Sequence, residues 1–200
     1  MSQQLLFAFV VFAAVMSFTP GPNNVMVMSS GLTYGFRRTL PHMTGVACGF
    51  AFMVAAVGFG LGAVFVAHPM LQTILKYLGA AYLIYLAVVI AMSGSVNADD
   101  GGSRKPMSFW AAALFQWVNV KGWVAVIGSI TAYAAIASFP FNILLQAAIV
   151  FAMAVGSTVT WTLFGTALRP LLMSKRAVRA FNILMAVLLL ASLFPVFIDA

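Results

Sequence analysis

The sequence predicts an all-α integral membrane protein with six transmembrane helices. Of its 200 residues, 64% are hydrophobic and 6% are charged, whereas a soluble domain carries about 25% charged residues. The apolar runs are hydrophobic on every face, so they indicate helices and not the alternating strands of an outer-membrane barrel. We expect one polytopic domain over residues 1–200, with spans at about 5–30, 40–65, 71–92, 108–134, 143–168 and 178–198.

The basic residues predict how these spans are oriented. Eight Lys and Arg residues lie in odd-numbered connections, while the even side has only Lys76. Because positive residues stay in the cytoplasm, both termini are expected to face away from it and loop 93–106 to face it. The net charge of +7 is then explained by topology and by anionic lipid headgroups, and we expect no nucleic-acid partner. Leu5 onward is expected to be a retained span and not a signal peptide.

The few reactive side chains exclude several kinds of chemistry. Cys48 is the single cysteine, which excludes an intramolecular disulfide, a paired-cysteine metal site and dithiol redox chemistry. The only acids are Asp99, Asp100 and Asp199, all outside the spans. With no acid and no paired histidines in the membrane, few catalytic constellations are possible. We expect a protein that is not an enzyme and that has no metal or cofactor.

The first span contains the stretch Thr19-Pro20-Gly21-Pro22-Asn23-Asn24, which interrupts its apolar run. Each proline removes a backbone N–H, and Gly21 permits dihedral angles that a helix does not use. The break lies roughly 20 Å along a helix that begins near Leu5, deep in a hydrocarbon core of about 30 Å. Backbone groups freed there must face protein or water, and a half-helix beginning at Pro22 would direct free N–H groups at an anion. The alternative is a kinked helix that binds no ligand.

The second and third spans carry glycines that predict close helix packing. Gly45 and Gly49, and then Gly58 and Gly62, are small-xxx-small pairs. His42, near the start of the second span, is interpreted either as an interfacial residue or as a proton switch. The third span includes the run Gly79-Ala80-Ala81-Tyr82-Leu83.

The fourth span places Asn119 and Lys121 within an otherwise apolar run. A lysine near the membrane midplane costs roughly 2.5–3.5 kcal/mol and usually faces a cavity or a partner. Since no acid lies in any span, Lys121 is either neutral or paired with a group outside the chain, such as a substrate carboxylate. The alternative is a lysine that snorkels from a shorter span.

The two halves of the chain can be aligned as two repeats of three spans with opposite orientation. Pro20 then falls on Asn119, Ser30 on Ser129 and Tyr34 on Tyr133, which predicts that the first and fourth helices are broken at similar depth. The fifth and sixth spans hold side chains that could line a polar path, although each could equally bond its own helix: Gln146, Ser157, Thr158, Thr160, Thr162 and Asn182.

These motifs resemble the LysE/RhtB family of amino-acid exporters, and the resemblance covers nearly the whole chain. The residues that carry it are Thr19 to Asn24, then Gly31, Gly35, Arg37, Gly45 and Gly49, the run from Gly79 to Leu83, and Asn119 to Lys121. The third signature is commonly Asn-Pro-Lys, and here Val120 replaces the proline. Val118-Asn119-Val120-Lys121 and Lys105-Pro106 look most like the cysteine and O-acetylserine exporter branch.

The resemblance implies a proton-driven exporter of small amino acids or derivatives, of the cysteine/O-acetylserine or the homoserine/threonine kind, in a bacterial inner membrane. Proton coupling would fall on Lys121, His42 or half-helix dipoles. A non-transporting structural or regulatory subunit remains the alternative, and a homodimer is a possible assembly. The expected substrate-binding residues are Pro20, Gly21, Pro22, Asn23, Asn24, Asn119 and Lys121.

Overall fold

The computed structural model describes residues 2–92, 105–170 and 174–192, so most of the predicted loop at 93–106 lies outside the described residues. Every regular element described is helical. The first half contains α1 (Gln3–Phe18), α2 (Pro22–Tyr34), α3 (Phe36–Ala56), the π-helical turn η1 (Val57–Leu61), α4 (Gly62–Ala67) and α5 (Pro69–Ala91). The second contains α6 (Phe109–Phe115), the 3₁₀ turn η2 (Gln116–Val118), α7 (Val120–Ala132), η3 (Ala134–Ile136), α8 (Phe141–Leu168) and α9 (Lys175–Ala191).

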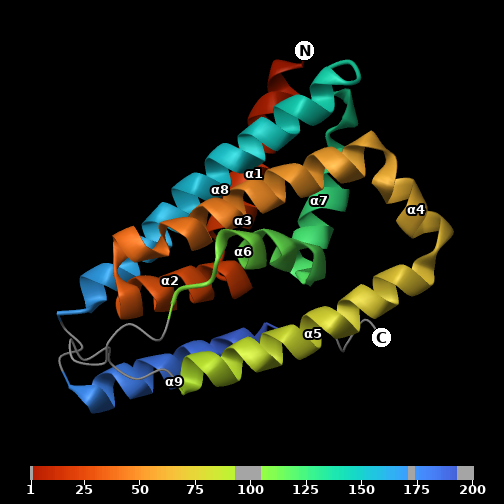
Figure 1. Ribbon diagram of the computed structural model, residues 1–200. Helices are drawn as coiled ribbons and strands as arrows, with labels where there is room; N and C mark the ends of the chain where they lie inside the picture. The colour runs from red at the N-terminus through yellow and green to blue at the C-terminus, as the bar shows by residue number, and fades with distance from the viewer. Residues whose placement is uncertain (1, 93–104, 171–173, 193–200) are drawn as a thin grey trace.

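The helices confirm the predicted membrane fold class, including the two broken helices. Among the described residues, three helical stretches are long and apolar enough to cross a membrane: Phe36–Val64, Thr73–Ala91 and Phe141–Leu168. Two further spans are bent pairs, with α1 and α2 meeting at 53° and α6–η2 and α7 meeting at 70°. The sixth apolar helix is α9, which has 17 residues and lies along α5 (Figure 1).

A single glycine connects α2 to α3. Gly35 has φ 79°, a left-handed conformation that glycine adopts without a Cβ penalty. The Thr39 hydroxyl donates to the carbonyl of Gly35 at 2.9 Å and lies 3.2 Å from the Ser30 hydroxyl. This turn therefore folds α3 back beside α2. The hydroxyls of Ser30 in α2 and Thr39 in α3 stabilise the turn.

The predicted glycine packing is confirmed for the α3–α6 contact. A Cβ on Gly45 would clash with the carbonyl oxygen of Phe109, and one on Gly49 would lie 2.7 Å from the Cα of Ala113. In another helix pair, Gly31 of α2 meets the backbone of Thr162 in α8. Backbone-to-backbone contacts of this kind hold helices together where lipid removes the hydrophobic driving force.

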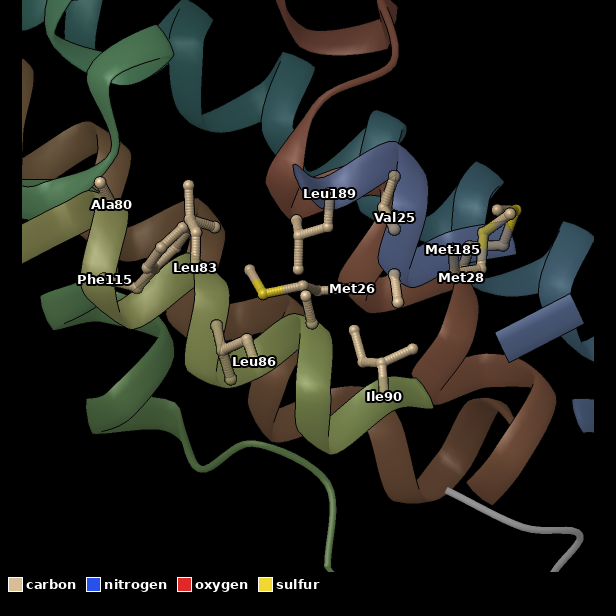
Figure 2. Packing of buried hydrophobic residues seen from close by; sticks show 12 residues of the cluster. Val25, Met26, Met28, Ala80, Leu83, Leu86, Ile90, Phe115, Met185 and Leu189 are labelled. Atoms are coloured by element: carbon tan, nitrogen blue, oxygen red, sulfur yellow. The ribbon is translucent and has the colours of Figure 1, made fainter. Parts of the chain in front are cut away.

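Half-helix α2 is enclosed on several sides. Val25, Met26 and Met28 point into an apolar cluster with side chains of α5 and α9 (Figure 2), while α8 packs along another side of the helix. All residues from Pro22 to Leu32 are buried. The segment that follows the first break is thus a core element, although it interrupts a membrane span.

The proposed repeat places the two breaks at aligned positions. Half-helices α2 and α7 have 13 residues each, and the residues that precede them, Gly21 and Asn119, have extended backbones. The first break was expected from its prolines. The second forms at Asn119 although Val120 stands where a proline would force it.

Candidate functional site

The first break is shaped by the space that Gly21 leaves and not by an unusual backbone. As expected, Gly21 has dihedral angles that a helix does not use, but its φ of −170° and ψ of −178° are extended angles open to any residue. A Cβ at Gly21 would lie 3.0 Å from Cδ of Lys121 and 3.1 Å from its Nζ. Glycine therefore leaves room for the side chain of Lys121, which would have to shift to make way for a Cβ.

Side chains from three elements satisfy the carbonyls freed at the end of α1. The amide nitrogen of Asn24 donates to the carbonyls of Ser17 and Thr19 at 3.0 and 2.9 Å. Ser157 of α8 donates to the Ser17 carbonyl at 2.7 Å, and Lys121 Nζ donates to the Thr19 carbonyl at 2.6 Å. The break meets the requirement that backbone groups inside a membrane be paired within the protein.

The second break is held by contacts with other helices. Gly79 of α5 lies so close to η2 that a Cβ there would clash with the carbonyl oxygen of Val118. Because Gly79 has no side chain, the backbone of η2 can lie against α5 just before the break at Asn119. This contact gives the run from Gly79 to Leu83 a structural reason that its sequence alone did not reveal.

Gln116 links the two breaks, and sequence reasoning missed it. Its Oε1 accepts from Asn23 Nδ2 at 2.8 Å, and its Nε2 donates to Asn23 Oδ1 at 3.2 Å and to the carbonyl of Ala112 at 2.8 Å. The side chain is completely buried. A glutamine three residues before Asn119 in an apolar run was the available signal, because a buried amide needs polar partners.

A cavity of about 60 Å³ lies between the breaks, several times the about 10–15 Å³ that a single water requires. Its walls come from α1, α2, α3, α7 and α8. Pro20 is exposed and lies outside the cavity. The other six expected binding residues line it: Gly21, Pro22, Asn23, Asn24, Asn119 and Lys121.

Two uncapped helix N-termini face this cavity. Neither Gly21 before α2 nor Asn119 before α7 caps its helix with a side chain, so N–H groups of both first turns lack an intrahelical acceptor. The partial positive charge of both ends adds to the ammonium of Lys121, which lies in the first turn of α7. Together these groups form a site suited to a carboxylate.

Two acceptors lie next to these positive groups. The Thr19 carbonyl belongs to the negative end of α1, and Oδ1 of Asn119 is buried with no hydrogen-bond partner among the described residues. We expected Asn23 to be available as well, but Gln116 engages both polar ends of its amide. A zwitterion could therefore place its ammonium at Thr19 and Asn119 and its carboxylate at the two N-termini.

The polar residues of α8 divide into two groups. Ser157 and Thr158 line the cavity, whereas Gln146, Thr160 and Thr162 do not. Thr158 and Thr160 bond carbonyls one turn earlier in their own helix, each at 2.8 Å. Local bonding, the alternative interpretation, therefore holds for these two threonines, whereas Ser157 and Gln146 donate to carbonyls outside α8.

His42 is buried in the bundle and is not exposed at its surface. It is 2% exposed, and neither ring nitrogen has a partner among the described residues. It does not line the cavity. Its position is thus separate from the contacts of Lys121.

Broken helices around a cavity inside a membrane bundle are typical of secondary transporters. The family model of LysE type translocators matches residues 14–196, and the chain belongs to this family. Its family and its apolar helices make it a multi-pass cell-membrane protein.

The chain is also similar to individual proteins of known name. The chain is 37% identical over 124 residues to the cysteine/O-acetylserine efflux protein of Escherichia coli (strain K12), and equally to that of Shigella sonnei (strain Ss046). Each match covers 60% of this chain, and the chain spans 61% of the relative's length. No solved structure matches the chain.

Proposed function

We propose that this protein is a secondary active exporter of small amino acids or their derivatives, of the cysteine/O-acetylserine kind, driven by the proton gradient across a bacterial inner membrane. One observation carries the proposal. Two half-helix N-termini and Lys121 line a single small cavity, and Lys121 Nζ is bonded there to the carbonyl of Thr19 at the end of α1. This arrangement complements the opposed charges of an amino-acid zwitterion.

The carboxylate is bound at the positive side of the cavity. Lys121 supplies a compact ammonium, and the first turns of α2 and α7 supply backbone N–H groups. The apolar wall formed by Val46, Phe50, Val54 and Val126 receives the substrate side chain. A cavity of about 60 Å³ favours short side chains over long or aromatic ones.

The bond between Lys121 and the Thr19 carbonyl suggests how binding proceeds. A substrate ammonium that takes the Thr19 carbonyl releases Lys121 to turn toward the substrate carboxylate. Every charged group keeps a partner during this exchange, which avoids the cost of an unpaired charge inside the membrane.

Proton coupling falls on few residues. The chain has three acids, Asp99, Asp100 and Asp199, and all lie outside the described residues. Lys121 and the buried His42, whose ring nitrogens are unpartnered among the described residues, are the proton carriers that we assign. The half-helix ends add electrostatic support.

The orientation follows from the charges and from two contacts. The backbone N–H of Ser2 donates to the carbonyl of Ile136 at 3.3 Å, so the N-terminus lies at the connection between the fourth and fifth spans (Figure 1). At Gly35, a Cβ would lie 3.7 Å from Nη1 of Arg169, which brings two basic connections together. We assign that basic end to the cytoplasm and the termini to the outside.

Transport into inverted membrane vesicles tests the function. Labelled cysteine and O-acetylserine should accumulate, and clamping the pH gradient and the membrane potential separately identifies the driving force. Lys121→Met should weaken substrate affinity strongly, because a hydrogen bond to a charged group contributes about 1.5–3 kcal/mol. Lys105→Met, which removes an exposed lysine, is the matched control. Unchanged affinity and pH dependence in folded Lys121→Met protein would remove Lys121 from the site.

A further inference from the structure

A second concave site lies between α5 and α7. Its volume is about 390 Å³, within the range of small-molecule sites. The indole N–H of Trp123, which lines it, is already bonded to the carbonyl of Trp117 at 2.8 Å, so that wall offers no free donor. The lining residues are Leu75, Lys76, Val118, Val120, Trp123, Val124 and Ile127, and we call this site the α5–α7 groove.

Lys76 is the one charged residue in the lining of the α5–α7 groove, and it is half-buried. A cation at this position needs an anion or water, because the other six lining side chains are hydrophobic. Lys76 lies seven residues after the start of α5 at Pro69, which is about 10 Å along the helix. Its flexible stem can therefore bring the ammonium to the headgroup level of the membrane while its methylenes contact the groove.

The charge of Lys76 discriminates between two possible occupants. A second copy of this chain would have to offer an acid within a span, but its three acids are Asp99, Asp100 and Asp199, all outside the predicted spans. A phospholipid offers a phosphate and an apolar chain in one molecule. Exposed side chains continue the apolar surface beside the groove, since Val124 is 64% and Leu78 is 56% exposed.

We propose that the α5–α7 groove binds an anionic phospholipid, with the phosphate on Lys76 and one acyl chain along Val118, Val120, Val124 and Ile127. Val118 and Val120 flank Asn119, so the acyl chain packs against the back of the second break. The lipid therefore supports the backbone that positions Asn119 and Lys121. This inference does not depend on which substrate the protein carries.

Native mass spectrometry of the purified protein tests the proposal with two lipids of identical palmitoyl and oleoyl chains, phosphatidylglycerol and phosphatidylcholine. Wild-type protein should retain phosphatidylglycerol in preference. Lys76→Gln should lower its retention about fivefold, the factor expected for one lysine near an anionic surface, while Lys76→Arg should keep it. Lys105→Gln is the control, because Lys105 is exposed and outside the groove.

A second variant tests the acyl-chain site. Val124→Trp should occupy part of the groove while leaving the charge of Lys76 in place, and it should lower the retention of both lipids. Equal retention of the two lipids by wild-type protein, or a Lys76→Gln variant that retains phosphatidylglycerol as wild type does, would overturn the proposal. A lipid-free dimer that Val124→Trp dissociates would overturn it as well, and would assign the groove to a second copy of the chain.

Discussion

Half-helices α2 and α7 have the same length and follow aligned breaks, yet they lie in different surroundings. All residues of α2 from Pro22 to Leu32 are buried. In α7 the buried residues are Gly122, Val126 and Ser129, and Val124 and Ile127 are 64% and 44% exposed. The comparison shows that one side of the cavity is built into the protein core, while the other is buried along one face only. We infer that α2 is the fixed wall and α7 the wall that can move.

The strongest test of this difference is a pair of glycine substitutions. In Gly31→Val of α2, the new Cβ would clash with the carbonyl oxygen of Thr162 and lie 3.1 Å from its carbonyl carbon. We expect a loss of about 3 kcal/mol or more, because neither backbone can give way. Gly128→Val of α7 should change stability by less than about 0.5 kcal/mol, since nothing lies within 4 Å of the added Cβ. Thermal unfolding in detergent measures both, and equal losses would contradict the comparison.

The next test removes the amide pair that connects the two walls. Gln116→Leu leaves the buried amide of Asn23 without its partner, which should cost about 1–3 kcal/mol. The double variant Asn23→Leu/Gln116→Leu should cost less than the sum of the two single changes. A strictly additive double-mutant cycle, measured by denaturant unfolding, would mean that the pair does not couple the breaks.

A smaller effect is expected at the contact between Gly21, which precedes α2, and the side chain of Lys121 in α7. Gly21→Ala keeps an extended backbone that alanine adopts freely, but its Cβ displaces Lys121 from the Thr19 carbonyl. Folding should be normal and vesicle uptake should fall about tenfold, equivalent to about 1.4 kcal/mol. Combined with Lys121→Met, the alanine should have no additional effect. An additive loss would show that Gly21 acts independently of Lys121.

The smallest expected effect comes from making the second break resemble the first. Val120→Pro introduces proline at the first position of α7, where its missing N–H and fixed φ suit a helix start. Because the break is already formed, we expect a change within about 0.5 kcal/mol in unfolding experiments. Val124→Pro, in the interior of α7, should cost about 3 kcal/mol. A large loss from Val120→Pro would indicate that the chain at Asn119 is not broken as described.

Some of these features were readable from the sequence because backbone chemistry determines them locally. The prolines at positions 20 and 22 predicted the first break, and a lysine in an apolar run predicted a polar site near the middle of the fourth span. Both predictions place residues that line one cavity. The assignment of Lys121 to substrate binding stays a prediction.

Other features depend on which helices become neighbours. The role of Gln116, the occupied amide of Asn23 and the contact between Gly79 and Val118 require knowledge of the packing. The different burial of α2 and α7 was also invisible, because a membrane helix is apolar whether lipid or protein surrounds it. The same reasoning explains why Gly21 was assigned a conformational role when its actual constraint is the neighbouring side chain.

The bond between Lys121 and Thr19 has a consequence for concentration dependence. In the proposed exchange, a tethered ammonium occupies the place that an incoming ammonium needs, so it acts as an internal competitor. The apparent dissociation constant equals the intrinsic one divided by the fraction of protein molecules in which the Thr19 carbonyl is free. An exporter built in this way stays idle at low cytoplasmic concentrations and reaches half-saturation only when its substrate accumulates. On the outer side of the membrane, Lys121 would speed substrate release by bonding the Thr19 carbonyl again in place of the substrate ammonium.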